Sequence, residues 1–228
     1  MVDLTSEFTP ISSKATLSTT KINPDKIDEV VEHYSIPSWK DRAPEITHSS
    51  NISSTKFLLP ESDHILVSRL NPSTHKVWRV GSAKKGIKRL ASTEWAVVVP
   101  HEGENIDYIN SALEDPSFSS QLNAHVTGST NSHQRVRAKD FLRLEIPFKQ
   151  SKIETDWIGK THKLLRESNE NTLSNIRLLQ NLTHSLFRSW FIDFDPVKAK
   201  AEGKLPYGMD EETAVLFPDS LEDSEKGQ

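Results

Sequence analysis

Basic and polar side chains gather in two stretches of this 228-residue chain, and their types suit contacts with a polyanion. Residues 64–93 carry seven basic side chains and no acidic one, and residues 131–152 carry six basic and two acidic ones. Arginine offers paired donors to guanine, asparagine and glutamine pair with adenine, and lysines and hydroxyl groups suit phosphates. Local charge of this kind decides the attraction to phosphates, even though the whole chain has a net charge of −4.

The candidate DNA-contacting residues are donors and amides of the first stretch and of a polar-basic loop, residues 129–137, at the start of the second. They are Ser68, Arg69, Asn71, Lys76, Arg79, Lys84, Lys85, Lys88, Arg89, Ser129, Asn131, His133, Gln134, Arg135 and Arg137. A solvated charged surface without a ligand is the alternative, and the basic run without an acid between residues 64 and 93 favours DNA. Within the set, we predict that Arg69 and Arg135 read bases, whereas Lys84 and Lys85 contact phosphates.

The sequence contains no arrangement of residues typical of an active site or a metal centre. No glycine-rich phosphate loop follows a predicted strand, and neither a His-Glu-x-x-His motif nor a serine elbow occurs. The nine histidines are scattered, and the absence of cysteine excludes disulfides, thiolate ligands and a cysteine nucleophile. Asp193 and Asp195 are interpreted as the end of a helix that leads into a solvated segment. We therefore expect no catalytic residue, no metal site and no cofactor in this chain, and no enzyme activity of its own.

The elements that must position the candidate residues are predicted as a mixed α+β domain over residues 1–150. Strands at His64–Leu70 and Lys76–Val80 are predicted to form a hairpin, and Trp95–Val99 to form a central buried strand. The remaining predicted elements are helices at Pro24–Tyr34, Asn105–Leu113 and Pro116–Val126, and a strand at Phe141–Ile146 that Pro147 ends. The strands and helices do not alternate as they do in a parallel sheet.

A long amphipathic helix is predicted from Ile153 to Phe191, because no proline and only Gly159 interrupts this stretch. Ser151-Lys152-Ile153-Glu154 matches a capping box at its start, and Pro196 is expected to stop it. At about 1.5 Å per residue the helix is roughly 55–60 Å long, which exceeds the diameter of a small domain. Much of it is therefore expected to lie against something other than its own domain.

Two series of residues spaced by seven form a seam along this helix. They are Ile158, Leu165, Thr172, Leu179 and Leu186, and His162, Asn169, Ile176, Thr183 and Trp190. Six of the ten are apolar, which gives a usable coiled-coil seam with polar interruptions. The alternative, a helix packed wholly on its own domain, is disfavoured because the preceding 150 residues are too few to cover it from end to end.

The end of the predicted helix carries the most specific motif, Trp190–Val197, with the sequence WFIDFDPV. Four neighbouring segments belong with this motif: Leu178–Ser189, Lys200–Gly203, Gly208–Asp210 and Leu216–Asp219. Five upstream segments complete the pattern: Ile65–Pro72, Lys76–Trp78, Ala91–Trp95, Thr127–Ser129 and His133–Val136. Together they resemble the specificity (S) subunits of type I restriction-modification systems, and the upstream segments look like a target recognition domain. The resemblance covers nearly the whole chain from about Phe8.

The resemblance implies a non-catalytic subunit that reads double-stranded DNA and docks methyltransferase (M) subunits and, through the complex, restriction (R) subunits. S-adenosylmethionine, ATP and magnesium then belong to the partner subunits, and the recognition domain reads one half of a bipartite site. The resemblance also implies a place in the cytoplasm of a bacterium or archaeon. The sequence shows no signal peptide, and no apolar run approaches the roughly 18 residues that span a bilayer, so no membrane partner is expected.

Family members usually carry two recognition domains and two antiparallel helices, whereas this sequence has one of each. We expect a recognition domain at residues 1–150, a spacer and dimerisation helix at 151–194, and a short irregular extension at 195–228, in a chain that is either a naturally short half-subunit or a truncated one. Two copies are expected to pair through their helices and to read an interrupted palindrome. The competing hypothesis is a non-catalytic assembly protein that uses the helix alone and carries a degenerate DNA-binding domain.

Overall fold

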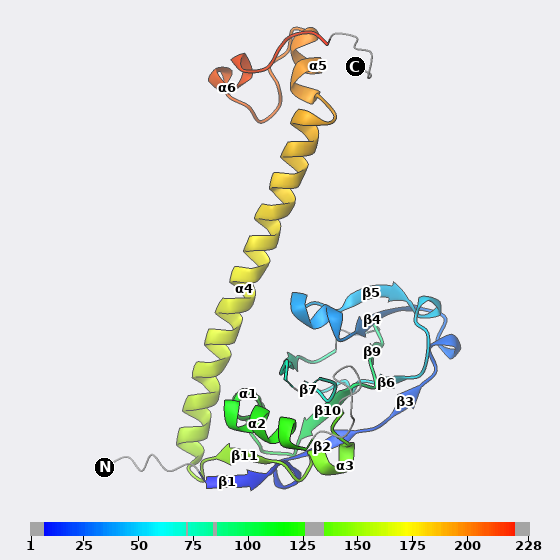
Figure 1. Cartoon of the computed structure of the whole chain (residues 1–228), viewed down its shortest axis with the longest axis vertical. Coiled ribbons are helices and arrows are strands. Elements are labelled where there is room, and N and C mark those ends of the chain that lie inside the picture. Colours follow the sequence, from blue (N-terminus) through cyan, green and yellow to red (C-terminus); the bar gives the residue numbers. More distant parts are fainter. Residues whose placement is uncertain (1–6, 72, 84–85, 126–134, 222–228) are drawn as a thin grey trace. The chain divides into compact units, whose positions relative to one another are not determined.

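The structure, a computed structural model, describes residues 7–71, 73–83, 86–125 and 135–221 of the chain (Figure 1). Contacts divide the chain into two units, Met1–Ser168 and Asn169–Gln228, and helix α4 (Lys152–Phe191) begins in the first unit and ends in the second. The predicted α+β class is confirmed. The domain limits predicted at residues 150 and 194 were placed at the ends of the predicted helix, not by contacts, and they stay a prediction.

Two sheets form most of the first unit. The four-stranded sheet is antiparallel and has the order β2 (Ala15–Ser18), β10 (Trp95–Pro100), β7 (His64–Ser68), β8 (Val77–Val80). The five-stranded sheet has the order β3 (Lys21–Ile22), β6 (Lys56–Leu58), β9 (Arg89–Ala91), β4 (Val30–Tyr34), β5 (Glu45–His48), with β4 and β9 parallel. A separate pair joins β1 (Glu7–Pro10) to β11 (Glu145–Phe148), and β11 comes directly before α4 in the chain.

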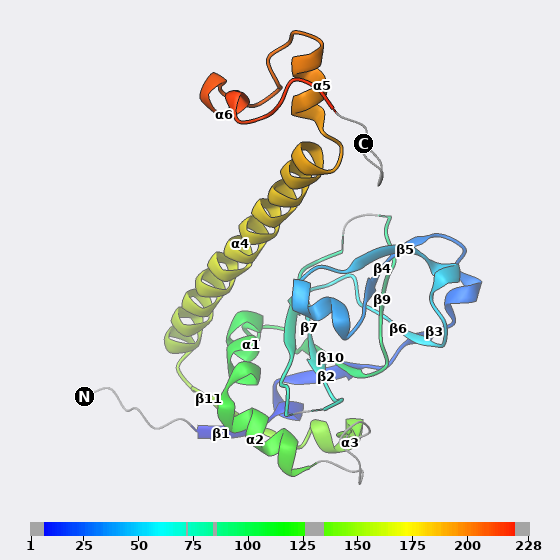
Figure 2. The same cartoon turned by 45° about the horizontal axis from the view of Figure 1, so that its top comes forward.

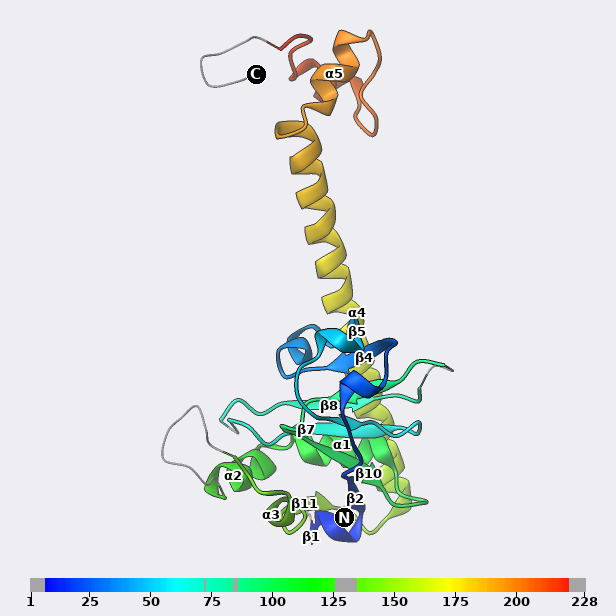
Figure 3. The ribbon, with the colours of Figure 1, turned by 90° about the vertical axis from the view of Figure 1, so that its right-hand side faces the viewer.

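The first unit has three layers because successive side chains of a strand point to opposite faces. Its helices are α1 (Ile106–Glu114), α2 (Pro116–Ala124) and α3 (Ala138–Phe141). Ile65 and Val67 pack in one core with α1 and α2, and α1 lies beside β7 (Figure 2). Leu66 and Trp95 pack in a second core with residues of the five-stranded sheet. Figure 3 shows the ribbon of the unit from another side, with β4 and β5 next to β7 and β8. Each such buried side chain contributes about 1.5–3 kcal/mol, so both faces of the four-stranded sheet stabilise the unit.

Most predicted elements of this unit are confirmed. The β7–β8 hairpin forms with Leu66 opposite Trp78. Strand β10 lies between β2 and β7, and its Trp95 is fully buried. Helices α1 and α2 begin at the side chains of Asn105 and Asp115, which accept hydrogen bonds from the first free backbone N–H groups.

The helix predicted at Pro24–Tyr34 is wrong. Pro24–Lys26 forms a single 3-10 turn, as expected of a proline in a first helical turn, but the chain then enters strand β4. Val30 and Val31 are β-branched and favour the extended chain, and β4 pairs on both sides, with β5 and β9. Tertiary pairing therefore overrides the local helical pattern.

The strand predicted at Phe141–Ile146 is also wrong in its position. Phe141 ends the short helix α3, where its side chain is fully buried, and the strand β11 begins only at Glu145. Pro147 does not end this strand but lies within it. A strand tolerates proline where one side needs no ladder hydrogen bond, and β11 pairs only with β1 among the described strands.

Helix α4 runs without interruption for 40 residues, as predicted. The Ser151 hydroxyl accepts a hydrogen bond from the Glu154 N–H at 3.4 Å, which agrees with the predicted cap. The helix ends at Phe191, and Phe194 has a left-handed φ of 54°, so Pro196 does not stop it. Pro196 instead stands in the first turn of α5 (Asp195–Ala201), the position that suits proline. None of the described helices combines the length and apolar character needed to cross a membrane.

The C-terminal extension contains α5 and a further short helix, α6 (Glu211–Val215), that the sequence did not predict. The Lys200 ammonium donates to the carbonyl oxygen of Ala214 at 3.0 Å and also to that of Phe217. The Phe217 ring contacts Trp190 and Phe191, with centroids 5.6 and 6.1 Å apart. One lysine and one aromatic cluster thus hold the extension together.

Replacing Lys200 by methionine is expected to unfold the extension and leave the first unit folded. Two carbonyl oxygens lose a charged donor, which costs about 1–3 kcal/mol and raises local opening by roughly 5- to 150-fold. Hydrogen exchange measures this: amides of α5 and α6 should exchange faster, and those of β7 and β10 should not change. Lys204→Met is the control, because Lys204 pairs with Glu202 on the exposed surface. Equal protection in both variants would contradict the prediction.

Acid is expected to destabilise the first unit through His64, whose buried Nδ1–H donates to the Ser62 carbonyl at 2.8 Å. Burial lowers the pKa of His64 to about 4. Because the folded pKa lies below the unfolded value of about 6.5, the contribution of His64 is fully present above pH 6.5 and is lost as the pH falls toward 4. At about 1.4 kcal/mol per pKa unit, the loss reaches about 3 kcal/mol.

Urea unfolding at pH 7 and pH 4.5 measures this loss, with His64→Asn as the comparison because its amide keeps a donor. Burial also lowers the pKa values of His33 and His75, so the parent curve contains the effects of three histidines. At pH 7 the free energy of unfolding of the variant should be lower than that of the parent. Between pH 7 and pH 4.5 it should fall by less than that of the parent. Parallel pH profiles of the two proteins would contradict the role of His64.

Candidate nucleic-acid interface

The end of the β7–β8 hairpin lies beside the residues that lead into α3. Leu70 forms an antiparallel bridge with Arg135, and the Val136 N–H donates to the Arg69 carbonyl at 3.1 Å. Val136 is fully buried, which fixes this segment against the core. The two basic stretches of the sequence therefore meet here, although 67 positions separate Arg69 from Val136.

Arg69 holds this junction together from inside. Its guanidinium donates to the carbonyl oxygens of Thr93 at 2.6 Å, Trp95 at 3.4 Å and Val136 at 3.4 Å. Burial, and secondarily the nearby Arg135, lower the pKa of Arg69, as expected of a desolvated cation. Three of its N–H groups donate to carbonyl oxygens of two backbone segments, which suits a residue that positions the junction. The predicted contact of Arg69 with a base stays a prediction.

Arg135 and Arg137 lie on the outside of the same junction, and each has a side chain 59% exposed. Arg135 pairs with Glu94 at 3.0 Å, and Arg137 pairs with Asp140 at 2.7 Å. Surface ion pairs of this kind are worth about 0–1 kcal/mol, so both guanidinium groups can exchange their carboxylate for a phosphate or a base edge at little cost.

Two cations that the sequence reading passed over lie close to this pair in the chain. Lys139 belongs to α3 and Arg143 follows it, and both are exposed. Both belong to the basic stretch 131–152, and Arg143 falls within the strand predicted at Phe141–Ile146, whose outward side the sequence does not reveal. We add them to the candidate residues.

The turn of the hairpin is shaped by Asn71. This residue has a left-handed φ of 49°, which asparagine tolerates better than most residues, and its side-chain oxygen accepts from the Ser73 hydroxyl at 2.9 Å. Lys76 donates to the carbonyl and the hydroxyl of Thr74 at 2.9 and 2.6 Å. Asn71 and Lys76 are both partly exposed, so they stay candidates, with Asn71 also setting the path of the turn.

Ser68 and Arg89 use their polar groups inside the fold, so their predicted contacts with DNA gain no support from their positions. Ser68 is buried and its hydroxyl donates to the Leu70 carbonyl at 2.9 Å. Arg89 is 4% exposed and donates to the carbonyl oxygen of Gly81 at 2.5 Å and to that of Pro60. A charge run in a sequence does not reveal which of its members face inward.

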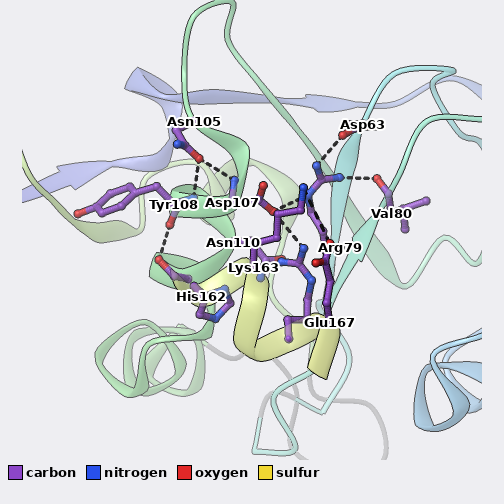
Figure 4. A network of polar contacts seen from close by, with 12 residues as sticks. Asp63, Arg79, Val80, Asn105, Asp107, Tyr108, Asn110, His162, Lys163 and Glu167 are labelled. Carbon is purple, nitrogen blue, oxygen red and sulfur yellow. Dashed lines mark hydrogen bonds and ion pairs between the residues drawn. The ribbon is translucent and has the colours of Figure 1, made fainter. Parts of the chain in front are cut away.

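Arg79 is likewise engaged within the unit, with a side chain 9% exposed (Figure 4). It pairs with Asp63 at 2.6 Å and with Asp107 at 3.4 Å. Arg79 is thus a member of an internal ionic network, and its predicted contact with DNA stays a prediction.

Of the remaining candidates, Lys88 lies within the described residues and six others do not. Lys88 is half-exposed and pairs with Glu29 at 2.6 Å, so it stays a candidate for phosphate contact. The others lie outside the described residues, namely Lys84, Lys85, Ser129, Asn131, His133 and Gln134. Among the residues that the structure describes, no group of histidines and carboxylates is placed to hold a metal ion.

The predicted helix seam begins within the first unit. Ile158 and His162 are partly buried there, and the His162 Nε2 lies 3.0 Å from a carboxylate oxygen of Glu114 on α1. These two positions are therefore occupied by contacts of the unit itself. Leu165, by contrast, is 64% exposed.

Within the second unit the seam is open to solvent. Ile176, Leu179 and Leu186 are 45%, 62% and 49% exposed, and the polar seam positions Asn169, Thr172 and Thr183 are exposed as well. Trp190 is partly covered by Phe217 of the extension. The seam that a partner helix can cover is thus shorter than predicted and runs from Leu165 to Leu186.

Comparison with known proteins finds similarity in structure but not in sequence. No protein-family model matches the chain, and no curated protein matches it. The S subunit of a type I restriction-modification system from M. genitalium matches with a TM-score of 0.60 at 14% identity, over 89% of this chain and 50% of its own. The HsdS subunit from Thermoanaerobacter tengcongensis matches with a TM-score of 0.57 at 16% identity, over 91% and 52%.

A third match comes from a structural study of complex assembly and conformational transition in the type I R-M system. It has a TM-score of 0.58 at 15% identity and covers 92% of this chain and 52% of that one. This chain therefore spans about half the length of the solved structures that it matches. The family resemblance seen in the sequence is confirmed at the level of the fold: the chain has the fold of type I restriction-modification S subunits.

Proposed function

We propose that the chain is the DNA-recognition subunit of a type I restriction-modification enzyme and has no catalytic activity of its own. The observation that carries the proposal is the fold that about nine-tenths of the chain shares with S subunits. The sequence motifs at Trp190–Val197 and in the hairpin support it independently.

The first unit reads one half of a bipartite DNA site in this proposal. Its contact surface is the junction of the hairpin turn with the segment before α3. Arg135, exposed like Arg137, lies opposite Leu70, which is next to Asn71 in the chain. Arginine can recognise guanine through two hydrogen bonds, and Lys76 suits phosphate. The candidates Lys84, Lys85, Ser129, Asn131, His133 and Gln134 lie outside the described residues, and their DNA contacts stay a prediction from the sequence.

Helix α4 sets the distance between two half-sites in this proposal. A second copy pairs with it antiparallel, through the open seam from Leu165 to Leu186, and the two-fold dimer then matches a two-fold DNA site. The exposure of leucines along this helix supports a partner, because exposed apolar stripes of this length mark interaction surfaces. The helix also docks the M subunit and, through the complex, the R subunit.

The cofactors S-adenosylmethionine, ATP and magnesium are assigned to those partner subunits. The proposed location is the cytoplasm of a bacterium or archaeon, where the DNA substrate lies.

Expressing the chain with an M subunit from the same system and mapping modified bases across a genome tests the proposal. The expected result is methylation at one interrupted palindrome with a fixed gap. The absence of sequence-specific methylation would overturn the assignment, and an asymmetric motif would overturn the homodimer alone.

The competing function, an assembly protein with a degenerate DNA-binding domain, has one observation in its favour. Arg69, Arg79 and Arg89 make internal contacts, so the first basic stretch offers fewer free cations than its sequence suggests. Binding to selected and to random DNA over a range of salt separates the two functions. A recognition subunit prefers the selected site at every salt concentration, whereas an assembly protein shows no preference.

A further inference from the structure

The base of α4, residues 152–168, is attached to the first unit without burying a large apolar side chain. Ile153, Trp157 and Leu164 are 83%, 68% and 57% exposed, and the buried residues of this segment are Thr155 and Gly159. Helices in proteins are usually held by an apolar face packed on a core. Ile158 is the one large apolar side chain of this segment that is partly buried, so polar contacts must supply much of what fixes the base of this helix.

Gly159 lets α4 approach the beginning of α1 closely. A Cβ atom at this position would lie 2.8 Å from the Asn105 side-chain oxygen and 2.9 Å from the Tyr108 backbone nitrogen. That oxygen accepts the hydrogen bonds that cap α1, and the amide nitrogen of Asn105 donates to Asp156 of α4 at 2.8 Å. One asparagine thus caps one helix and contacts the other, and only glycine leaves room for it.

Asp107 joins three elements of the unit. The same carboxylate oxygen lies 3.1 Å from Arg166 of α4 and 3.4 Å from Arg79 of β8, and Arg79 also pairs with Asp63 (Figure 4). The side chains of Asp107, Arg166 and Arg79 are only 18%, 13% and 9% exposed, so the charges interact more strongly than a surface pair does. Arg79 belongs to the hairpin that carries Asn71 and Lys76 in its turn and next strand.

We propose that Asp107 and Gly159 are positioning residues that hold the base of α4 against α1 and the hairpin. This attachment, called the lock below, restricts the complex to one number of base pairs between the two DNA half-sites. The inference rests on the proposed function, in which the unit reads one half-site and the helix sets the gap. Loosening a polar lock lets the helix base tilt without opening the apolar cores, which α4 does not enter with a large side chain.

A small tilt is enough to change the gap. The 23 residues of α4 beyond Ser168 extend roughly 35 Å at about 1.5 Å per residue. A tilt of about 6° then displaces the far end by about 3.4 Å, which is the rise of one base pair. The lock must hold the helix within a few degrees for a single gap to be preferred.

Distance measurement between two spin labels tests the lock directly. The chain has no cysteine, so Leu164→Cys on α4 and Ser120→Cys on α2 provide the only attachment sites, and both positions are exposed. We expect a narrow distance distribution in this labelled parent and a broader one after Asp107→Asn, Arg166→Met or Gly159→Ala. Glu167→Gln is the matched control, because it removes only a surface pair with Lys163 at 3.9 Å on the same helix. Unchanged widths in the three variants would overturn the lock.

A second experiment measures how the complex with the M subunit binds a series of DNA molecules. Their gaps between half-sites differ in steps of one base pair. The parent should prefer one gap, and each lock variant should reduce that preference roughly tenfold, equivalent to about 1.4 kcal/mol, while binding to a single half-site is retained. Arg166→Met changes only a residue of α4 and leaves α1 as it is. It therefore remains informative if Asp107→Asn destabilises α1 itself. A parent without bipartite selection refutes the proposed function, whereas a selective parent whose variants keep the same gap preference refutes the lock alone.

Discussion

The double substitution Leu179→Asp and Leu186→Asp is expected to convert the proposed dimer into monomers. Both leucines are largely exposed in the isolated chain and lie on the seam that a second α4 covers. Each buried leucine contributes about 1.5–3 kcal/mol, and a two-fold dimer loses four of them. The dissociation constant should therefore rise by at least roughly a thousandfold, and methylation of the bipartite site should be lost with it. Light scattering at micromolar concentration measures the mass.

The control places the same charges on the opposite side of the helix. Ser174→Asp and Asn181→Asp introduce two carboxylates, seven residues apart like the leucines, at exposed positions that a 3.6-residue period turns away from Leu179 and Leu186. This variant should keep the mass and the methylation of the parent. A parent that is monomeric without the M subunit, or a leucine variant with unchanged mass, would remove the support for the seam.

Replacing Arg69 by alanine is expected to destabilise the first unit and to abolish binding to all DNA. Three carbonyl oxygens lose their donor at the junction of β7, β10 and the segment before α3. A buried acceptor left without a partner costs about 1–3 kcal/mol, so the total loss is roughly 3–5 kcal/mol of the free energy of unfolding. Urea unfolding measures this loss, and DNA binding should fall equally on selected and random sequences.

Arg135→Ala provides the contrast for Arg69. Its side chain is exposed, so the free energy of unfolding should change little, while selectivity at one base position should relax by about 1–3 kcal/mol. Arg137→Ala serves as the neighbouring comparison with a similarly exposed pair. If Arg69→Ala left stability intact and relaxed a single base position, the assignment of the two arginines would have to be exchanged.

The sequence predicted the elements whose pattern is local. The hairpin, the central strand β10 and the helices α1, α2 and α4 each follow from apolar periodicity, and Asp115 and Ser151 mark helix starts through caps. Strand β4 was missed because its extended form depends on pairing with β5 and β9, which are distant in sequence. The left-handed Phe194 that ends α4 carries no sequence signal of its own, since neither glycine nor asparagine stands there.

The candidate interface was predictable as a charged region but not residue by residue. The meeting of the two basic stretches depends on the bridge between Leu70 and Arg135, a tertiary contact that no local pattern reveals. Periodicity also could not distinguish Arg69 and Arg79, which face inward to carbonyl and carboxylate groups, from Arg135, which faces outward. The role of Gly159 is a further example, because its meaning lies in the neighbouring Asn105.

The leucine-lined half of α4 has a consequence for the lifetime of the protein in the cell. A helix whose apolar side chains meet water gains little from tertiary packing, so its local opening costs little free energy. Proteases cleave open segments in proportion to how often they open, and a bound partner suppresses that opening. A copy without a partner is therefore the first to be degraded, and the amount of this subunit should follow the amount of the protein that covers its helix.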